Sequence, residues 1–277
     1  MAFLIIDFRS LWLMARPQAE ASRCDGRGSM HEILRHVGAG SSVLDLGSGT
    51  GSFDPCGHPF RTIRLDLEPP PPIGGAFSIR GDAGRLPFAA GSFDAVVSNH
   101  SLEHVRELDA CLREIGRILT PGGAVFIAVP GSETITDRLY RWLADGGGHV
   151  NAFPDAKSLV RRLELATGLP VLAVRPLLTS LSFLNRKNGR SRIPRKAALI
   201  GYGYATSLHL INLVLRTVDR VARTKTALYG WAIYLGNVSE EVAIAPWANV
   251  CIRCGGGHPA EALLQEGRIR RRWGVLR

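Results

Sequence analysis

The chain has 277 residues, of which 45% are hydrophobic and 21% charged. This is enough apolar content for one α/β domain and an extension of about 100 residues, and it excludes a disordered chain. Its five scattered cysteines exclude a framework of paired disulfides and favour a reducing compartment, so we expect a cytoplasmic protein.

The positive charge lies entirely in the second half of the chain. Residues 1–150 carry 14 Lys and Arg against 17 Asp and Glu, and residues 151–277 carry 20 against 7. This asymmetry favours an anionic partner for the second half, such as phospholipid headgroups, a phosphorylated substrate or nucleic acid. A solvated Arg-rich surface explains it equally well. Nucleic acid is the least favoured partner because no recognition motif is present.

Residues 1–30 are interpreted as an N-terminal segment. Its apolar stretch, residues 3–14, is interrupted by Asp7 and Arg9 and lacks a basic leading region. A packing helix is therefore expected there in place of a cleaved signal peptide.

A buried strand and a glycine-rich turn follow. Residues 43–46 form a short apolar run interrupted only by Asp45, as expected of a parallel strand, and Gly47, Gly49 and Gly51 come next at alternate positions. Glycines can adopt positive φ and let a ligand lie against bare backbone. Asp45 is expected to orient this loop or to accept from a cationic amine.

The second strand, residues 62–65, ends in Asp66. A carboxylate about 20 residues beyond the start of such a loop is where doubly wound folds hold a ribose diol. The crossover segments on either side of this strand are unusual. Pro55, Gly57 and Pro59 forbid a regular helix before it, and four prolines, residues 69–72, follow it.

The remaining pattern alternates strands and helices, which predicts a parallel sheet covered on both faces. Strands are expected at residues 76–80, 93–98, 124–129, 169–174 and 247–254, and helices at 30–37, 101–119, 132–144 and 154–167. The sequence Thr-Pro-Gly-Gly at 120–123 is interpreted as a turn. Ligands are expected outside the carboxyl ends of the strands.

Four stretches in this order, D-L-G-S-G-T-G, L-D, G-D-A-G-R-L-P-F and F-D-A-V-V-S-N-H-S-L-E-H-V, resemble the successive motifs of class I S-adenosylmethionine-dependent methyltransferases. The resemblance implies a Rossmann-like, mostly parallel seven-stranded sheet whose last strand is antiparallel, with a helical insertion between strands six and seven. It implies a methyltransferase core at 31–176, a basic helical insertion or lid at 177–245, and the last strand and tail at 246–277. S-adenosylmethionine would then be bound by Asp45, Gly47, Gly49, Gly51, Asp66, Asp82, Ala83 and Asn99, with Asp82 at the adenine amino group.

Methyl transfer needs a base when the acceptor is a hydroxyl group, and histidine fits because its unperturbed pKa lies near neutrality. His149, in a glycine-rich loop after the fifth strand, is the first candidate for the catalytic base. His100, at the tip of the fourth strand, is the second. A structural role explains either histidine equally well.

Two metal sites are also conceivable. His100, Glu103 and His104, with the distant His149, resemble the Glu-x-x-Glu-His and distant His arrangement of small-RNA 2′-O-methyltransferases, and the Glu-x-x-Glu-His stretch of ubiquinone-pathway O-methyltransferases, which hold a divalent metal. His100 in place of the first Glu would favour a transition metal over magnesium. Separately, Cys251, Cys254 and His258 have spacings that suit zinc but supply only three ligands, and Cys56 and His58 are conceivable partners.

An uncharged stretch, residues 197–215, is flanked by basic residues on both sides. Its length just reaches that of a membrane-spanning helix, but its many polar residues argue against that assignment. A lid helix packed on the domain and an interfacial helix anchored to an anionic membrane both remain open. Membrane association of a cytoplasmic protein is thus one alternative.

The leading hypothesis is an S-adenosylmethionine-dependent methyltransferase that acts on a small or lipid-linked molecule at oxygen. The alternatives are a non-catalytic binding module that retains the cofactor fold, and a methyltransferase that acts on RNA. A nicotinamide dehydrogenase is disfavoured because the loop reads G-x-G-x-G and not G-x-G-x-x-G.

Overall fold

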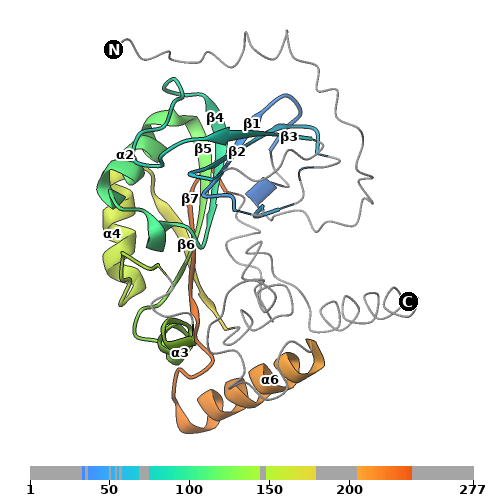
Figure 1. The fold of residues 1–277 in the computed structure, drawn as a ribbon, viewed down its shortest axis with the longest axis vertical. Coiled ribbons are helices and arrows are strands. Elements are labelled where there is room, and N and C mark those ends of the chain that lie inside the picture. Colours follow the sequence, from blue (N-terminus) through green and yellow to red (C-terminus); the bar gives the residue numbers. More distant parts are fainter. Residues whose placement is uncertain are drawn as a thin grey trace, which may run out of the picture.

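The computed structural model describes residues 33–34, 37–49, 51–53, 55, 58–68, 75–143, 148–178 and 205–238, with only the backbone at 205–209. Its centre is a single seven-stranded sheet, with helices α2 and α4 side by side on one face (Figure 1). In the part of the chain that the structure describes, no helix is long and apolar enough to cross a membrane.

The strands follow the order β3-β2-β1-β4-β5-β7-β6 across the sheet. Neighbouring strands are parallel except for β7, which runs antiparallel to both β5 and β6. This confirms the Rossmann-like sheet with an antiparallel last strand. The strands are β1 Ser42–Leu46, β2 Arg61–Asp66, β3 Ala76–Arg80, β4 Phe93–Asn99, β5 Leu119–Pro130, β6 Val171–Leu177 and β7 Gly230–Gly236.

Side chains from alternate strand positions enter two hydrophobic cores. Val125, Ile127 and Val129 of β5 belong to the core beneath α2 and α4, whereas Ala124, Phe126 and Ala128 belong to the core on the opposite face. Both faces of a central parallel strand are covered, so the strand is apolar at nearly every position.

The helices include α2 Leu108–Ile118, α3 Ile135–Leu143, α4 Ala156–Thr167 and α6 Ala205–Ala222. The continuous helix predicted for residues 101–119 is wrong, because a short 3₁₀ helix, Leu102–His104, is separated from α2. Asn151 explains the break. Its side-chain amide donates to the carbonyls of Leu102 and Val105, which a continuous helix would use for its own backbone bonds.

The predicted position of the last strand is also wrong. The antiparallel strand is β7, Gly230–Gly236. Residues 247–254, and with them the whole predicted unit 246–277, lie outside the described residues. Residues 230–236 and 247–254 are both apolar enough for the strand between β5 and β6. The first run has glycines at the two positions where the neighbouring backbone leaves no room for a side chain. A Cβ at Gly230 would lie 2.0 Å from the carbonyl oxygen of Val129, and one at Gly236 would lie 2.2 Å from that of Gly123.

Smaller differences occur elsewhere. The predicted turn at residues 120–123 lies within β5, where the pairing with β4 shifts register between Phe93 and Ala95. The uncharged stretch 197–215 is described only from residue 205, where α6 begins. The proline run at 69–72, residues 1–30 and the Cys251, Cys254 and His258 group lie outside the described residues.

Candidate functional site

The turn after β1 is shaped by glycines with positive φ. Gly47 has φ 67° and Gly51 has φ 101°, in the region that favours glycine. A Cβ at Gly47 would lie 2.3 Å from Cβ of Ser101, so the turn approaches the end of β4 too closely for any side chain. Gly49, at the tip, has φ 46° and open space around a built Cβ. The turn therefore presents bare backbone at its tip.

Two of the predicted acids stabilise this turn. Asp45 is buried, and its carboxylate accepts from the Ser52 hydroxyl at 2.6 Å and from the Ser52 amide at 3.0 Å. Burial raises the pKa of Asp45, although the hydrogen bonds from Ser52 oppose that effect. Asp66, at the end of β2, accepts from the Gly49 amide at 2.8 Å. The two carboxylates thus fix the beginning, the tip and the end of the turn.

Asp82 and Ala83 lie just after β3. The Asp82 side chain is exposed and accepts from the Gly84 amide at 2.9 Å, which closes a tight turn. Ala83 packs against the core beneath α2. The structure therefore brings Asp82 to the same edge of the sheet as Asp45 and Asp66, each at or near the end of a parallel strand.

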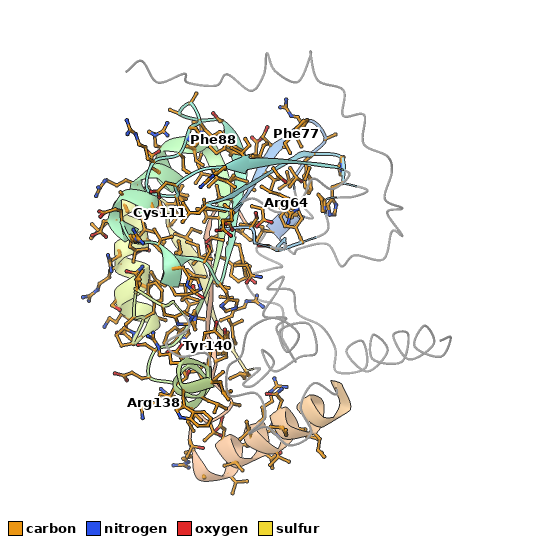
Figure 2. All side chains as sticks on the ribbon, viewed as in Figure 1. Arg64, Phe77, Phe88, Cys111, Arg138 and Tyr140 are labelled. Carbon is orange, nitrogen blue, oxygen red and sulfur yellow. The ribbon has the colours of Figure 1, made fainter. Side chains whose placement is uncertain are left out.

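Arg64 is a site residue that the sequence analysis missed. It lies in the middle of β2, is 2% exposed, and approaches the carbonyl oxygen of Gly49 with Nη2 at 3.4 Å (Figure 2). A Cβ at Gly51 would lie 3.0 Å from the same nitrogen. A buried guanidinium under the turn supplies positive charge next to Asp45. The only sequence signal was a charge inside an otherwise apolar strand.

Polar atoms without partners also face this region. The Ser48 hydroxyl and the side-chain oxygen of Asn99 are buried and have no hydrogen-bond partner among the described residues. Buried polar groups are normally satisfied, so an unsatisfied pair beside an open turn indicates a polar ligand. Ser101 connects the neighbouring strands, because its hydroxyl donates to the carbonyl of Leu46 at 3.1 Å.

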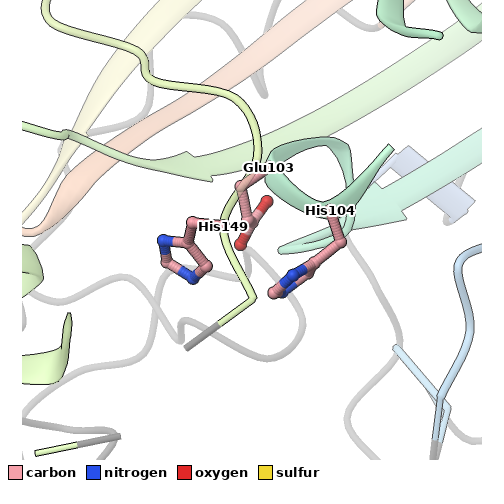
Figure 3. A group of neighbouring side chains, drawn as sticks. All are labelled: Glu103, His104 and His149. Atoms are coloured by element: carbon pink, nitrogen blue, oxygen red, sulfur yellow. The ribbon is translucent and has the colours of Figure 1, made fainter. Parts of the chain in front are cut away.

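A second group lies beyond the ends of β4 and β5. Glu103 and His104 come from the 3₁₀ helix after β4, and His149 comes from the loop after α3 (Figure 3). One ligand atom from each residue lies within 4.8 Å of the others. Burial raises the pKa of Glu103 to about 8, and Glu103 Oε2 has no described partner. The three side chains are therefore placed to hold a proton or to bind a cation.

Each imidazole of this group is oriented by a neighbour at Nδ1. His149 Nδ1 lies 3.1 Å from Asp137 Oδ1, and His104 Nδ1 lies 3.0 Å from the carbonyl oxygen of Gly148. Arg141 donates to the other oxygen of Asp137 at 2.6 Å. Burial alone would raise the pKa of Asp137, but the neighbouring His149 imidazole and the hydrogen bond from Arg141 outweigh burial and lower that pKa. An ionised Asp137 favours a proton on His149 Nδ1 and leaves Nε2 as the acceptor.

His100 lies apart from these ligand atoms. Its ring faces Tyr229, with centroids 5.0 Å apart, and its Nδ1 is 3.8 Å from Glu103 Oε1. Its backbone has φ 54°, an uncommon conformation for a residue other than glycine. Of the four residues predicted for this metal site, the structure brings three together and turns His100 towards Tyr229.

The predicted cofactor and histidine groups are electrostatically connected. Burial is the main effect that lowers the pKa of His104, while the Asp66 carboxylate raises it in opposition. The two groups thus lie close enough to interact, at the edge of the sheet where β1, β2 and β4 end. In open α/β sheets this edge is the ligand-binding edge.

Comparison with known proteins agrees with this geometry. Residues 44–127 match the family model described as a methyltransferase domain. A malonyl-[acyl-carrier protein] O-methyltransferase of Methylococcus capsulatus is 31% identical over 188 residues, which cover 57% of this chain and 68% of the relative. This chain belongs to the class I S-adenosylmethionine-dependent methyltransferases.

A demethylmenaquinone methyltransferase of Mycolicibacterium gilvum is also similar to this methyltransferase, with 32% identity over 112 residues. These residues cover 32% of this chain and 48% of the relative. The match to this second relative thus spans less than half of its length.

The residues of this methyltransferase fit S-adenosylmethionine. The open tip at Gly49 leaves room for a ligand, and Ser48 and Asn99 offer unsatisfied polar atoms beside it. Asp66 and Asp82 are the acids nearest the solvent at this edge, whereas the Asp45 carboxylate is engaged by Ser52. The structure thus favours the loop-orienting interpretation of Asp45 over direct contact with a cationic amine.

Proposed function

We propose that this methyltransferase methylates an oxygen atom of a small or lipid-linked acceptor, with His149 as the general base. The observation that carries the proposal is the 3.1 Å contact between His149 Nδ1 and the buried carboxylate of Asp137, beyond the ends of β4 and β5. A buried carboxylate behind an imidazole is how proteins fix a tautomer and orientation for proton transfer.

S-adenosylmethionine, when bound, supplies a methyl group activated by its sulfonium. That methyl group would pass to the acceptor oxygen, and the electron pair of the carbon–sulfur bond would remain on sulfur. His149 Nε2 takes the proton from the acceptor hydroxyl, and Asp137 stabilises the imidazolium that results. His149 then releases this proton to bulk water, which completes the cycle. In this scheme Asp137 is a positioning residue.

Neighbouring residues hold His149 in a fixed position. The loop that carries His149 is pinned at its far side, because the Val150 and Asn151 amides both donate to the Glu103 carbonyl. His149 is further packed against Tyr140, with ring centroids 5.1 Å apart. A base with a fixed position needs little reorganisation, and orientation of this kind supplies much of the rate in a displacement reaction.

The proposal for the acceptor remains at the level of chemical class. One relative is named for malonyl-[acyl-carrier protein] and another for demethylmenaquinone. The first name includes methylation at oxygen and an acceptor attached to a carrier protein, which supports this class of acceptor. Radiolabelled S-adenosylmethionine, incubated with the protein and fractionated extracts that include lipids, will identify the acceptor fraction.

The test of the base compares His149→Asn with His100→Asn. Loss of a general base costs about 10²- to 10⁴-fold in kcat. We expect this loss for His149→Asn, with S-adenosylmethionine binding unchanged, and a smaller loss for His100→Asn. Asp137→Asn should lower kcat with little change in KM and should alter the pH–rate profile. Full activity of His149→Asn would refute the role of His149, and a larger loss for His100→Asn would move the base there.

A second candidate is a divalent cation at Glu103, His104 and His149, in which case His149 would be a ligand and not the base. The favouring observation is that each imidazole presents Nε2 while its Nδ1 is engaged, the arrangement usual for metal-bound histidines. Two imidazoles and a carboxylate suit zinc, manganese or iron better than magnesium. The site would bind and orient an acceptor oxygen and lower the pKa of its hydroxyl group.

Metal analysis separates the two candidates. Under the second candidate, purified protein dialysed against each metal retains about one ion per chain. Glu103→Gln should abolish that retention, and the exposed Glu107→Gln serves as the control. Full activity in chelator, with no retained metal, would leave His149 as a base only.

A further inference from the structure

Helix α6 exposes an apolar stripe. Leu210, Ile211, Val214, Val218 and Val221 recur at spacings of three and four residues, and they are 60%, 37%, 52%, 42% and 79% exposed, respectively. Residues at these spacings share one helix face. The opposite face, with Asn212, Leu215 and Asp219, is half-buried. The stripe therefore points away from the described part of the protein.

Cations gather near the C-terminal end of this stripe. Arg220 is exposed on α6, Arg216 lies on the half-buried face with Asn212 and Asp219, and the exposed Arg223 and Lys225 follow the end of the helix. Between residues 205 and 238 the sequence contains four cations and one acid, Asp219. The single acid is already engaged, because its carboxylate accepts from Thr224, Thr226 and Ala227 and so closes the turn after the helix. The C-terminal end of α6, next to the stripe, is therefore strongly cationic.

A hollow of about 800 Å³ opens beside the helix. Apolar side chains from the strand ends and the turn, including Leu178, Leu228 and Trp231, form part of its lining. Arg216, Arg220 and Lys225 line it as well. A lining of apolar and cationic side chains suits an amphiphile that has an apolar tail and an anionic head.

The hollow also lies at the edge of the sheet that carries the candidate catalytic residues. Leu177 and Gly230, which pair with each other, flank it, and Pro130 at the carboxyl end of β5 pairs with Gly230. This is the edge where His100, Glu103 and His149 lie, and the His100 ring contacts Tyr229 in the same turn. An acceptor that reached the hollow would therefore be near the candidate catalytic group.

We propose that α6 docks on an anionic phospholipid bilayer, with the apolar stripe inserted at the headgroup boundary and the exposed cations at the C-terminal end of the helix on the lipid phosphates. Such helices lie in the plane of the interface with their apolar face buried about 5–10 Å. Charge complementarity decides the occupant. Five exposed aliphatic side chains favour an apolar medium, and four cations with one engaged acid favour an anionic partner. An anionic bilayer supplies both.

The test is vesicle co-sedimentation of the full chain. One set of vesicles is pure phosphatidylcholine, and the other contains phosphatidylglycerol as well. We expect at least about tenfold tighter binding to the anionic vesicles, with a loss of binding in high salt. The double variant Val214→Asp/Val218→Asp should weaken binding by more than about tenfold, and Arg220→Gln by about fivefold.

Matched controls come from α4, on the other side of the sheet. Leu165 is 87% exposed and Arg161 is exposed, so Leu165→Asp and Arg161→Gln change the same kinds of side chain elsewhere. Neither control should change vesicle binding. Circular dichroism should show unchanged helix content in the α6 variants, because the two valines make no buried core.

Several outcomes would overturn the inference. These are equal binding to neutral and anionic vesicles, vesicle binding unaffected by Val214→Asp/Val218→Asp, and no vesicle binding at all. In the last case, a change in oligomeric state of the double variant would point to a second copy of the chain on the stripe. Salt-sensitive retention on poly-glutamate without vesicle binding would point to an acidic protein. Calorimetry with S-adenosylmethionine is independent of all these results, so failure here leaves the proposed activity intact.

Discussion

At the scale of single residues, the turn after β1 contains two kinds of glycine. At one position a side chain would clash with a neighbouring residue, and at the other only the positive φ favours glycine. Gly47 is excluded from carrying a side chain on both grounds, since its φ is 67° and a Cβ would collide with Ser101. Gly49 has positive φ but no neighbour within 4 Å of a built Cβ. The two positions therefore predict different costs for the same substitution.

Gly47→Ala should destabilise the protein by about 3 kcal/mol or more, because a collision with Cβ of Ser101 adds to the cost of a left-handed conformation. Gly49→Ala should cost only about 1 kcal/mol, the conformational cost alone. Chemical denaturation of both variants measures the difference. Equal destabilisation would show that the approach of Ser101 to the turn is looser than described.

The residue scale also shows where sequence reasoning reached its limit. The glycines, Asp45 and Asp66 could be picked out from spacing, and Asp82 from the family resemblance, but the atoms that each carboxylate contacts could not be predicted. The sequence left two roles for Asp45, orienting the loop or accepting from a cationic amine. The structure shows its carboxylate bound to Ser52. Asp137 was missed because nothing local in its sequence indicates a partner 12 residues away at His149.

At the scale of elements, α2 is fastened to the segment after β3 by a charged pair. Arg117 donates to both oxygens of Glu114 at 2.7 Å, and also to the carbonyls of Leu86 and Phe88. Glu114 in turn accepts from the Leu86 amide at 2.8 Å. The hydrogen bond from Arg117 is the main reason that the pKa of Glu114 is lowered.

Glu114→Gln should therefore lower the free energy of unfolding by about 1 kcal/mol at pH 7. A lowered pKa in the folded state contributes stability above the unfolded pKa, and this contribution is lost as pH falls through the folded pKa. The difference from wild type should thus shrink as the pH falls from 7 to an acid pH well below the ordinary pKa of a glutamate. Urea denaturation at both pH values checks this, with the exposed Glu133→Gln as control. A constant difference at both pH values would contradict the assignment.

Strands with a strong local pattern were predicted almost to the residue. Predicted residues 76–80 are β3, and predicted residues 93–98 are β4 less its last residue. The last strand was misplaced because an apolar run of seven residues is equally plausible at two sites, and long-range pairing with β5 selects one of them. The break before α2 depends on Asn151, 46 residues from Val105, and no local pattern reveals it.

At the scale of the whole molecule, topology explains why the site could be anticipated before any contact was known. Parallel strands end at one edge, so motifs that follow β1, β2, β3 and β4 must converge there. The basic second half supplies α6 and the hollow at the same edge. Charge alone indicated an anionic partner, but which face of α6 is exposed required the fold.

The central claim is that this edge binds S-adenosylmethionine, and isothermal titration calorimetry of the full chain tests it most directly. We predict one binding site per chain, little or no heat with NAD, and a loss of binding in Gly47→Ala under conditions where the variant is folded. Folded wild-type protein that gives no binding heat with either S-adenosylmethionine or S-adenosylhomocysteine would contradict the account.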